Sequence, residues 1–268
     1  MPNNQITSLQ SPHVVRVKAL LGSRGKKIRA TEREFIADGI QSVREVLSPS
    51  FDDAPALIHL YVTEKGYAKL EVEIDAVILE GAPIVHVSDA VMDEMAETES
   101  PQGILALCKF TEITLYKIKQ RQAKKIAYFW EIQDPGNSGT VIRTAEALGF
   151  DAVIFSKNSV DVYSPKTVRA TVGALWHIPV VENIEVEELI EYATSEDFYT
   201  IALAGDGVGS IIDVAKSEKT ILIFGNEARG LPEITGLSAR VAIPMKGKSE
   251  SLNVASAAAI AMFEVGIR

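Results

Sequence analysis

The chain has 268 residues, is 47% hydrophobic and carries a formal net charge of −9. This length is enough for a sizeable core and predicts one or two domains. The single cysteine, Cys108, rules out an internal disulfide and is expected to be buried, while scattered histidines predict no metal site. No apolar run reaches membrane-spanning length and the first residues lack a signal-peptide core, which favours a cytoplasmic protein.

The first 110 residues alternate short helical and strand patterns, which indicates a compact α/β domain. Helices are expected at residues 13–21, 40–47, within 67–79 and at 89–95, and strands at 35–36, 57–62, 84–87 and 104–109. A basic loop that contains glycine is expected at residues 22–29. Residues 111–123 are polar and basic, and we interpret them as a linker to a second domain at residues 124–268.

The second domain alternates strands and helices, which predicts an α/β fold with a mostly parallel sheet. Strands are expected at residues 126–132, 152–155, 179–181, 199–204, 221–224 and 241–243, and helices at 140–148, 166–171, 186–194 and 254–265. Connection rules alone predict that such a sheet is not knotted.

The segment at residues 131–150 reads EIQDPGNSGTVIRTAEALGF and runs from a strand through a turn-rich loop into a helix. Residues 134–137 make the loop, and Gly149 ends the helix. Asn137 and Arg143 are therefore expected at the carboxyl end of a buried strand, where open α/β sheets bind ligands. An amide beside a guanidinium at such a place indicates recognition of a polar, phosphorylated substrate.

Two later segments carry similar strand-and-loop arrangements. Residues 221–231 read ILIFGNEARGL, and residues 241–256 read VAIPMKGKSESLNVAS. With these segments in this order, the chain closely resembles the SpoU family of RNA 2′-O-methyltransferases in the SPOUT superfamily. The family pattern, DPGN-x-G-x-x-x-RTA, then GNE-x-x-G, then IPM followed by SLNV, is matched at every core position. The resemblance covers the second half of the chain strongly and the first half more weakly.

The resemblance implies a deep trefoil knot, S-adenosyl-L-methionine as methyl donor, and a homodimer with its site near the subunit interface. The first domain resembles the ribosomal-protein-like substrate-binding domain of rRNA-directed members, although Asp38 stands where that family often has Glu. The implied substrate is a ribose 2′-hydroxyl of structured RNA, with 23S-type ribosomal RNA favoured over transfer RNA.

The family similarity implies that Arg143 activates the ribose hydroxyl. Four further polar residues of the motifs are catalytic candidates: Asn137, Glu227, Ser251 and Asn253. Because a guanidinium stays charged, Arg143 either passes a proton on through a substrate phosphate or stabilises the developing alkoxide, and we favour the second. In the alternative reading Arg143 is an ordinary surface arginine and the other residues shape turns or cap helices.

The cofactor is expected to contact backbone and apolar groups after the second and third of these strands. The candidates are Gly225, Gly230, Ile243, Met245 and Leu252. The two glycines allow close backbone approach, and the apolar side chains offer a wall for the adenosine. The alternative for Ile243 and Leu252 is plain core packing.

The negative net charge does not exclude an RNA partner, because binding depends on local fields. One basic run spans residues 16–33 and a second spans residues 117–125, and isolated charge runs are usually solvated faces. Two such runs beside an RNA-modifying domain favour RNA contact, with Lys26, Lys27, Arg29 and Arg169 as candidate residues. A solvated helix charge is an equal alternative for Arg169, and Trp176 is expected in the core.

Three rival functions remain open. A transfer-RNA 2′-O-methyltransferase differs only in its substrate, and a non-catalytic RNA-binding assembly factor is disfavoured by the intact polar motif residues. The glycine-rich stretch LAGDGVGS at residues 203–210 resembles a dinucleotide-binding loop, but a lone glycine triplet is weak support for a nicotinamide-dependent enzyme.

Overall fold

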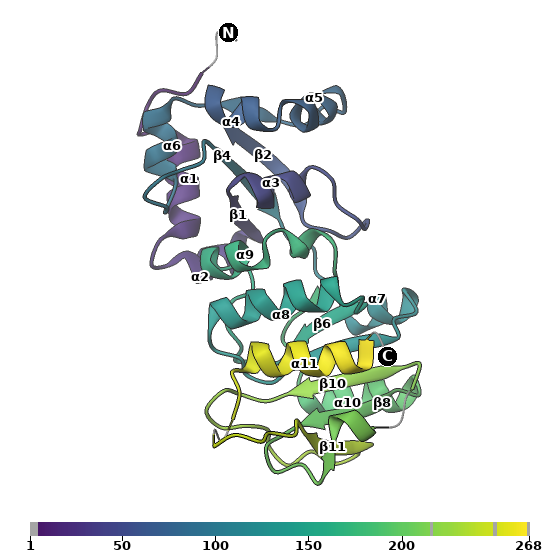
Figure 1. Cartoon of the computed structure of the whole chain (residues 1–268). Coiled ribbons are helices and arrows are strands. Elements are labelled where there is room, and N and C mark those ends of the chain that lie inside the picture. Colours follow the sequence, from purple (N-terminus) through teal and green to yellow (C-terminus); the bar gives the residue numbers. More distant parts are fainter. Residues whose placement is uncertain (1–4, 215–216, 249–250, 267–268) are drawn as a thin grey trace. The chain divides into compact units, whose positions relative to one another are not determined.

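The computed structural model describes residues 5–214, 217–248 and 251–266, and its helices and strands are labelled in Figure 1. By its internal contacts the chain divides into two compact units. Unit 1 comprises Met1–Thr111 and Asp161–His177, and unit 2 comprises Glu112–Val160 and Ile178–Arg268. The segment Asp161–His177 therefore belongs to unit 1, although it lies inside the range predicted for the second domain.

Unit 1 is built on a four-stranded sheet with the strand order β1-β4-β2-β3. The strands are β1 (Glu34–Asp38), β2 (Ala56–Val62), β3 (Ile84–His86) and β4 (Ile104–Lys109). Strand β4 pairs antiparallel with β1 and β2, whereas β2 and β3 are parallel. All four strands expected from the alternating pattern are confirmed, with bounds that differ by at most two residues.

Six helices of unit 1 come from its first 111 residues. They are α1 (Pro12–Leu21), α2 (Gly25–Glu32), α3 (Ile40–Val46), α4 (Glu64–Lys69), α5 (Glu71–Leu79) and α6 (Asp89–Met95). Helix α1 turns Val14, Val17 and Leu20 inward at helical spacing, and they pack in a cluster with Met92 of α6 and Leu105 of β4. The sequence period thus fixes which face of α1 covers the sheet.

The loop expected at residues 22–29 is confirmed for residues 22–24 and wrong for residues 25–29, because α2 begins at Gly25. Gly22 and Gly25 suggested a turn, yet the lysines, arginine and alanine that follow are good helix formers. A Cβ at Gly25 would lie 2.4 Å from the carbonyl oxygen of Leu20. Gly25 therefore lets α2 start close against the end of α1.

The segment Asp161–His177 contributes helix α9 (Pro165–Thr171) and the short 3-10 helix η1 (Ala174–Trp176) to unit 1. The ring of Tyr163 stacks on Phe110 with a centroid distance of 4.2 Å and lies 4.8 Å from Phe35. Trp176 is fully buried, as expected, and its indole N–H donates to the carbonyl of Pro55 at 3.0 Å.

A buried ion pair fastens the start of this segment. The guanidinium of Arg29 donates to Asp161 Oδ2 from Nε at 3.0 Å and from Nη2 at 2.7 Å, and its Nη1 donates to the carbonyl of Leu20. The side chains of Arg29 and Asp161 are only 7% and 14% exposed. The pair joins residues 132 positions apart, so it ties α2 to the entry of the α9 segment.

Unit 2 holds a seven-stranded sheet with the order β7-β6-β5-β10-β8-β11-β9, in which every neighbouring pair is parallel. Its strands are β5 (Lys125–Phe129), β6 (Ala152–Phe155), β7 (Val180–Val181), β8 (Tyr199–Leu203), β9 (Gly209–Ser210), β10 (Thr220–Phe224) and β11 (Ala239–Ala242). The mostly parallel α/β sheet is thus confirmed. Strand β9 was not expected, and the trefoil knot stays a prediction.

The helices of unit 2 are α7 (Leu115–Gln120), α8 (Pro135–Ala147), α10 (Val186–Ser195) and α11 (Val254–Gly266), with a short 3-10 helix η2 (Ile211–Asp213). Helices α8 and α11 pack against each other and lie side by side in Figure 1. Helix α7 lies in the stretch interpreted as a linker, and its Ile118 is fully buried. That stretch is therefore structured and belongs to unit 2.

We expect Asp161→Ala to lower the free energy of unfolding of unit 1 by about 3–5 kcal/mol, because it leaves the buried Arg29 guanidinium without its partner. Urea unfolding measures this loss. The chain has two tryptophans, so a Trp130→Phe background leaves the buried Trp176 as the fluorescent reporter of unit 1. Lys65→Ala, at a pair with both side chains largely exposed, is the control and should change stability by less than about 1 kcal/mol. Equal effects of the two substitutions would contradict the role given to the buried pair.

Candidate active site

The carboxyl ends of β5 and β10 bring two of the sequence motifs to one edge of the sheet. The strands are parallel neighbours, and their last residues, Phe129 and Phe224, stand opposite each other in the register. The chain leaves β5 toward Asp134 and leaves β10 toward Asn226. The two loops therefore start from adjacent points, which is where parallel α/β sheets bind ligands.

Helix α8 begins earlier than the sequence suggested. Asp134 is its N-cap and accepts a hydrogen bond from the amide of Asn137 at 2.7 Å, and Pro135 occupies the first helical position. Both are strong helix-start signals. The expected loop at residues 134–137 is thus the first turn of the helix, which gives Asn137 a fixed backbone.

The side-chain amide of Asn137 connects the three motifs. Its Nδ2 donates to Glu227 Oε1 at 3.2 Å, and its Oδ1 accepts from Asn253 Nδ2 at 3.0 Å. Glu227 Oε2 also accepts from the backbone amide of Gln133 at 3.4 Å. Three catalytic candidates therefore form one hydrogen-bonded chain, with the donor and acceptor ends of Asn137 both in use.

Asn253 has a second task at the start of α11. Its Oδ1 accepts hydrogen bonds from the amides of Ala255 at 2.9 Å and Ser256 at 3.3 Å. This is the helix-capping role that the sequence offered as an alternative, and it coexists with the contact to Asn137. The cap fixes the carbonyl end of the amide, so the Nδ2 group is aimed at Asn137.

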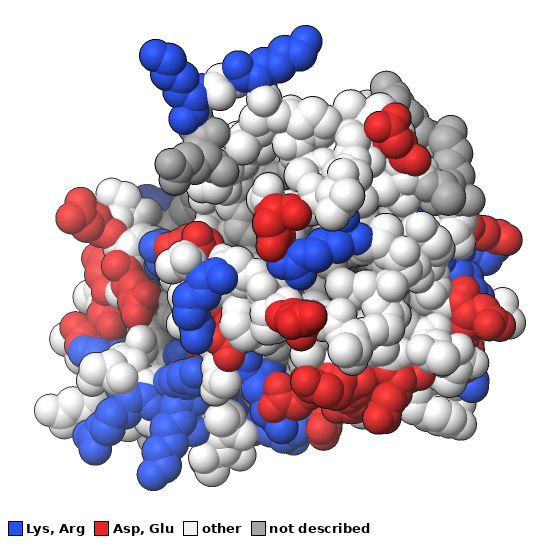
Figure 2. Space-filling model, turned by 90° about the horizontal axis from the view of Figure 1, so that it is seen from below, with Lys and Arg blue, Asp and Glu red and all other residues white. Residues whose placement is uncertain are grey.

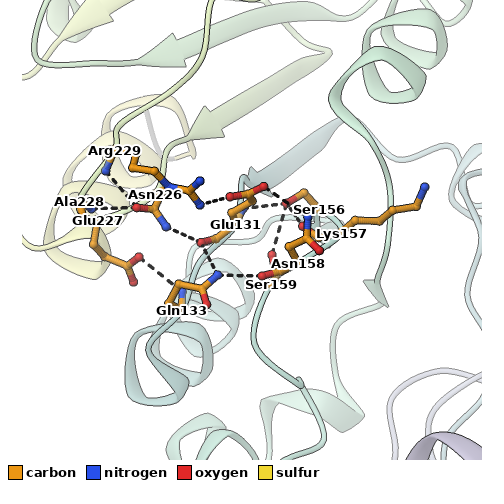
Figure 3. Close-up of polar contacts among 10 residues, drawn as sticks. All are labelled: Glu131, Gln133, Ser156, Lys157, Asn158, Ser159, Asn226, Glu227, Ala228 and Arg229. Carbon is orange, nitrogen blue, oxygen red and sulfur yellow. Dashed lines mark hydrogen bonds and ion pairs between the residues drawn. The ribbon is translucent and has the colours of Figure 1, made fainter.

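The turn after β10 is held by Asn226, whose side chain is largely buried. Its Nδ2 donates to the carbonyl of Glu131 at 2.7 Å, and its Oδ1 accepts from the amides of Ala228 and Arg229 at 2.9 and 3.0 Å (Figure 3). The backbones of Asn226 and Gly230 also exchange two hydrogen bonds, of 3.0 and 2.9 Å. One amide side chain thus shapes the turn and ties it to the end of the β5 strand.

Two glycines of this turn are required by geometry. A Cβ at Gly225 would lie 2.5 Å from the carbonyl carbon of Gly230, which no larger residue could tolerate. Gly230 has φ = 66°, in the left-handed region that glycine adopts at little cost. Both predicted cofactor-binding glycines therefore have a structural reason to be glycine, and they leave the backbone accessible.

The apolar candidates lie after β11. Ile243 is half-buried, whereas Met245 and Leu252 expose 41% and 40% of their surface. Core packing is therefore not the explanation for Leu252. Exposed apolar side chains are of the kind that can line a site for an adenosine-containing cofactor.

Arg143 and Ser251 are both exposed. Within the described residues neither makes a hydrogen bond or an ion pair, so the structure does not join them to the hydrogen bonds between Glu227, Asn137 and Asn253. Arg143 lies two helical turns after the start of α8 and keeps all its donors available.

The four RNA-binding candidates of unit 1 fall into two groups. Lys26 and Lys27 are exposed on α2, and no hydrogen bond or ion pair engages them among the described residues. Arg29 is buried in the pair with Asp161, and Arg169 Nη1 lies 3.5 Å from Glu97. Burial also raises the pKa of Asp38, which the positive charge of Arg169 opposes.

Two features of unit 2 do not belong to the site. A cavity of about 500 Å³ lies at the amino ends of β5, β6 and β10, where Lys124, Asp151 and Thr220 line it, and no motif residue borders it. The glycine-rich stretch after β8 packs on β11, since a Cβ at Gly207 would lie 2.2 Å from the carbonyl carbon of Val241. Close packing therefore explains Gly207 without a dinucleotide.

Neither the cysteine thiol nor any cluster of metal-binding side chains forms a second reactive site in the described residues. Cys108 is fully buried, as expected, and burial raises the pKa of its thiol far above the usual range. Among residues 5–214, 217–248 and 251–266, no cluster of three or more histidine, cysteine or acidic side chains could hold a metal ion. Nor does any helix in those ranges have the length and apolarity to cross a bilayer.

Sequence reasoning missed the residues around Glu131. Glu131 has φ = 48°, its amide donates to Ser156 Oγ at 2.7 Å, and its carboxylate forms an ion pair with Arg229. Gln133 Nε2 donates to the carbonyls of Glu131 at 3.0 Å and Asn158 at 2.7 Å. Glu131 and Arg229 are 98 positions apart, so only the fold reveals this network (Figure 3).

Comparison with known proteins identifies the family. Residues 95–263 match the SpoU rRNA Methylase family, and residues 15–106 match the MRM3-like substrate binding domain. The chain therefore belongs to the SpoU rRNA methylase family.

Individual relatives resemble the chain over nearly its whole length. It is 32% identical, over 90% of this chain and 91% of the relative, to the 23S rRNA (guanosine(2553)-2'-O)-methyltransferase RlmP of Bacillus subtilis. The AdoMet-bound rRNA methyltransferase of Sinorhizobium meliloti superposes with a TM-score of 0.83 at 28% identity, covering 98% of this chain and 97% of that one. The SpoU methyltransferase AviRb of Streptomyces viridochromogenes, in complex with AdoMet, gives a TM-score of 0.81 at 25% identity, covering 96% and 98%.

We expect Asn137→Asp to destabilise the protein by about 1 kcal/mol at pH 7, because it replaces the donor facing Glu227 with a second carboxylate. Repulsion raises the pKa of one of the two carboxyls in the folded state above its unfolded value. The penalty is therefore present at neutral pH and is relieved as the pH falls through that raised pKa.

Urea unfolding between pH 7 and pH 4 measures this dependence. Asn137→Ala removes the same hydrogen bonds without adding charge and is the matched control. Its stability difference from the parent should stay constant over this range. A constant difference for Asn137→Asp as well would show that Glu227 does not face the amide donor of Asn137.

Proposed function

We propose that this protein transfers the methyl group of S-adenosyl-L-methionine to a ribose 2′-hydroxyl of 23S-type ribosomal RNA. The observation that carries the proposal is the hydrogen-bonded chain from Glu227 through Asn137 to Asn253, which joins the three motifs at one edge of the sheet. The names of the relatives in Bacillus subtilis and Sinorhizobium meliloti support both the reaction and the class of RNA.

The cofactor would lie against the backbones of Gly225 and Gly230 and the side chains of Ile243, Met245 and Leu252. When bound, it would supply an electrophilic methyl carbon: the bond to the ribose oxygen would form as the carbon–sulfur bond breaks, S-adenosyl-L-homocysteine would leave, and the hydroxyl proton would pass to a substrate phosphate or to water. The exposed side chains of Met245 and Leu252 would exclude water from the adenosine. The fixed turn at Asn226 would keep the backbone in place, so that binding needs little reorganisation.

Arg143 would stabilise the alkoxide that develops on the ribose oxygen. Its guanidinium is exposed and has no partner among the described residues, so its donors are free for an oxygen of the substrate. A cation is effective there because the negative charge on the oxygen develops only in the transition state. Asn137, Glu227 and Asn253 would hold the surrounding loops in register, and Ser251 would contact the ribose or the methionine part of the cofactor.

The RNA would be held partly by the first domain, predicted at residues 1–110, to which the segment Asp161–His177 is added. The methyltransferase domain predicted at 124–268 would include α7 and lose that segment. Lys26 and Lys27 are the basic residues of α2 that remain exposed and unpaired within the described structure, which supports phosphate contact. The net charge of −9 does not oppose this. In the face drawn in Figure 2, several basic side chains gather at the lower left and several acidic ones at the lower right, while the two kinds are interspersed elsewhere, so the local charge can differ in sign from the net charge.

We further propose a homodimer in the cytoplasm. Ile260 and Phe263 lie three positions apart on α11 and expose 44% and 50% of their surface. An apolar stripe of this kind on a helix supports contact with a second copy of the chain.

Tritium transfer from labelled S-adenosyl-L-methionine to purified ribosomal RNA and to transfer RNA tests the reaction and the substrate together. We expect label in ribosomal RNA, in alkali-stable dinucleotides that mark 2′-O-methylation. Label in transfer RNA alone would favour the rival substrate. Cofactor binding without transfer to either RNA would favour a non-catalytic factor, and calorimetric binding of a nicotinamide dinucleotide instead would support the third rival.

Arg143→Lys should lower methyl transfer by about 100-fold or more while cofactor affinity stays within about twofold, because the lysine keeps the charge but loses the planar fork of donors. Transfer assays and calorimetry give the two values. Arg121→Lys is the control, since Arg121 is an exposed arginine that precedes the amino end of β5, away from the motif edge. Near-normal turnover of Arg143→Lys would remove Arg143 from the reaction.

A further inference from the structure

Trp130 and Arg229 form a stacked pair beside the candidate site. Trp130 directly follows β5, and its amide donates to the carbonyl of Phe224 at 2.8 Å. The guanidinium carbon of Arg229 lies 5.3 Å from the centroid of the Trp130 ring. Arg229 stands two positions after Glu227, which accepts a hydrogen bond from Asn137. The Trp130–Arg229 pair therefore lies next to the hydrogen bonds that join the motifs.

The position of Arg229 is fixed from several sides. Its Nη2 forms an ion pair with Glu131, and its backbone amide donates to Asn226 Oδ1 at 3.0 Å (Figure 3). Glu131 itself holds a left-handed backbone, which costs a non-glycine residue about 1 kcal/mol or more and persists only where the surroundings enforce it. Its amide and carbonyl bonds to Ser156, Asn226 and Gln133 supply that enforcement. The network thus holds a flexible side chain in one place.

A flat cationic surface remains open to solvent. The side chain of Arg229 is 62% exposed although Trp130 backs one face and Glu131 occupies one edge. Trp130 is only partly buried, and its indole N–H has no hydrogen-bond partner among the described residues. Ion pairing and stacking on the protein side therefore leave the outer face of the guanidinium available.

The carboxylate decides which ligand fits this surface. A phosphate could reach only the donors that Glu131 leaves free, Nε and Nη1, and the adjacent carboxylate would repel it. A nucleobase has no such conflict, because it stacks on the guanidinium plane and needs no donor from the edge. Bases of single-stranded or splayed RNA are the aromatic planes that a ribose-modifying site meets.

We propose that Arg229, backed by Trp130 and held by Glu131, is a stacking platform for a base of the RNA next to the ribose that is methylated. This rests on the proposed function for the identity of the substrate. Since every base has an aromatic face, the platform can hold the base next to the methylated ribose whatever the RNA sequence is.

Arg229→Lys is the principal test, because it keeps the charge and removes the plane. We expect the dissociation constant for a ribosomal RNA fragment, measured by filter binding without cofactor, to rise about 5- to 100-fold. Cofactor affinity by calorimetry should stay within about twofold. Trp130→Phe should raise the RNA dissociation constant less than Arg229→Lys, since a smaller ring still backs the guanidinium.

Arg240→Lys is the matched control. Arg240 also pairs with a carboxylate of unit 2, donating to Asp206 at 3.1 and 3.2 Å, but no aromatic ring of the described residues stacks on it. Its RNA and cofactor affinities should match those of the parent. A fluorescence titration adds a direct reading: RNA should quench Trp130 in the parent protein, and the quenching should disappear in Trp130→Phe, because Trp176 is buried.

Several outcomes would overturn the platform. Unchanged RNA affinity in Arg229→Lys would do so, as would a loss of cofactor affinity equal to the loss of RNA affinity, which would make Arg229 a residue that only shapes the turn. Absence of RNA binding by the parent protein would also overturn it. RNA binding and quenching by a parent protein that transfers no methyl group would instead defeat the proposed reaction and leave the platform supported.

Discussion

The bipolar side chain of Asn137 is the constraint on which the site depends. An amide has a donor at one end and an acceptor at the other. Here the donor of Asn137 bonds the carboxylate of Glu227, and its acceptor bonds the side-chain amide of Asn253. The partners lie 90 and 116 positions away in the sequence. Because Asn137 sits in the first turn of α8 and Asn253 caps α11, two helix starts and the turn after β10 are held in mutual register.

The turn after β10 shows how backbone geometry, rather than side-chain chemistry, can set a motif. Gly225 is needed because the chain folds back onto Gly230, and Gly230 is needed because its φ is positive. Asn226 then satisfies two amides of the turn and reaches across to the carbonyl of Glu131. A motif read as cofactor binding is therefore also a folding requirement, and the two roles place the same residues under the same constraint.

The sequence predicted what depends on local pattern. Alternating and helical periodicities predicted the strands of both sheets except β9, and most helices, because burial of one face imposes these periods. They failed at α2, where the turn is short and Gly25 already begins a helix packed closely on Leu20. They also failed at residues 134–137, where an aspartate cap followed by proline begins a helix. In both segments the glycines or proline indicated a loop, but the same residues can also stand at the start of a helix.

What the sequence did not predict arises from contacts between distant positions. The motif order pointed to Asn137, Glu227 and Asn253, but the ion pair between Glu131 and Arg229 and the assignment of Asp161–His177 to unit 1 needed the folded chain. The left-handed backbone of Glu131 has no local signal, since glutamate is an unusual residue there. Hydrogen bonds with Ser156 and Asn226, which are distant in the sequence, hold that conformation, so the residues next to Glu131 could not predict it.

Three arginines show how the partners of one side chain decide its use. Arg29 is buried with Asp161, and its charge holds the α9 segment in place. Removal of Arg29 would leave the buried carboxylate of Asp161 without a counter-charge. Arg143 is exposed and has no hydrogen-bond or ion-pair partner in the described structure, so its donors are open to a substrate oxygen in the proposed reaction. Arg229 lies between these cases, since its edge is neutralised by Glu131 while one face stays open. An occupied edge and a free face suit an aromatic plane. The proposed roles of the three side chains are therefore structure for Arg29, catalysis for Arg143 and base contact for Arg229.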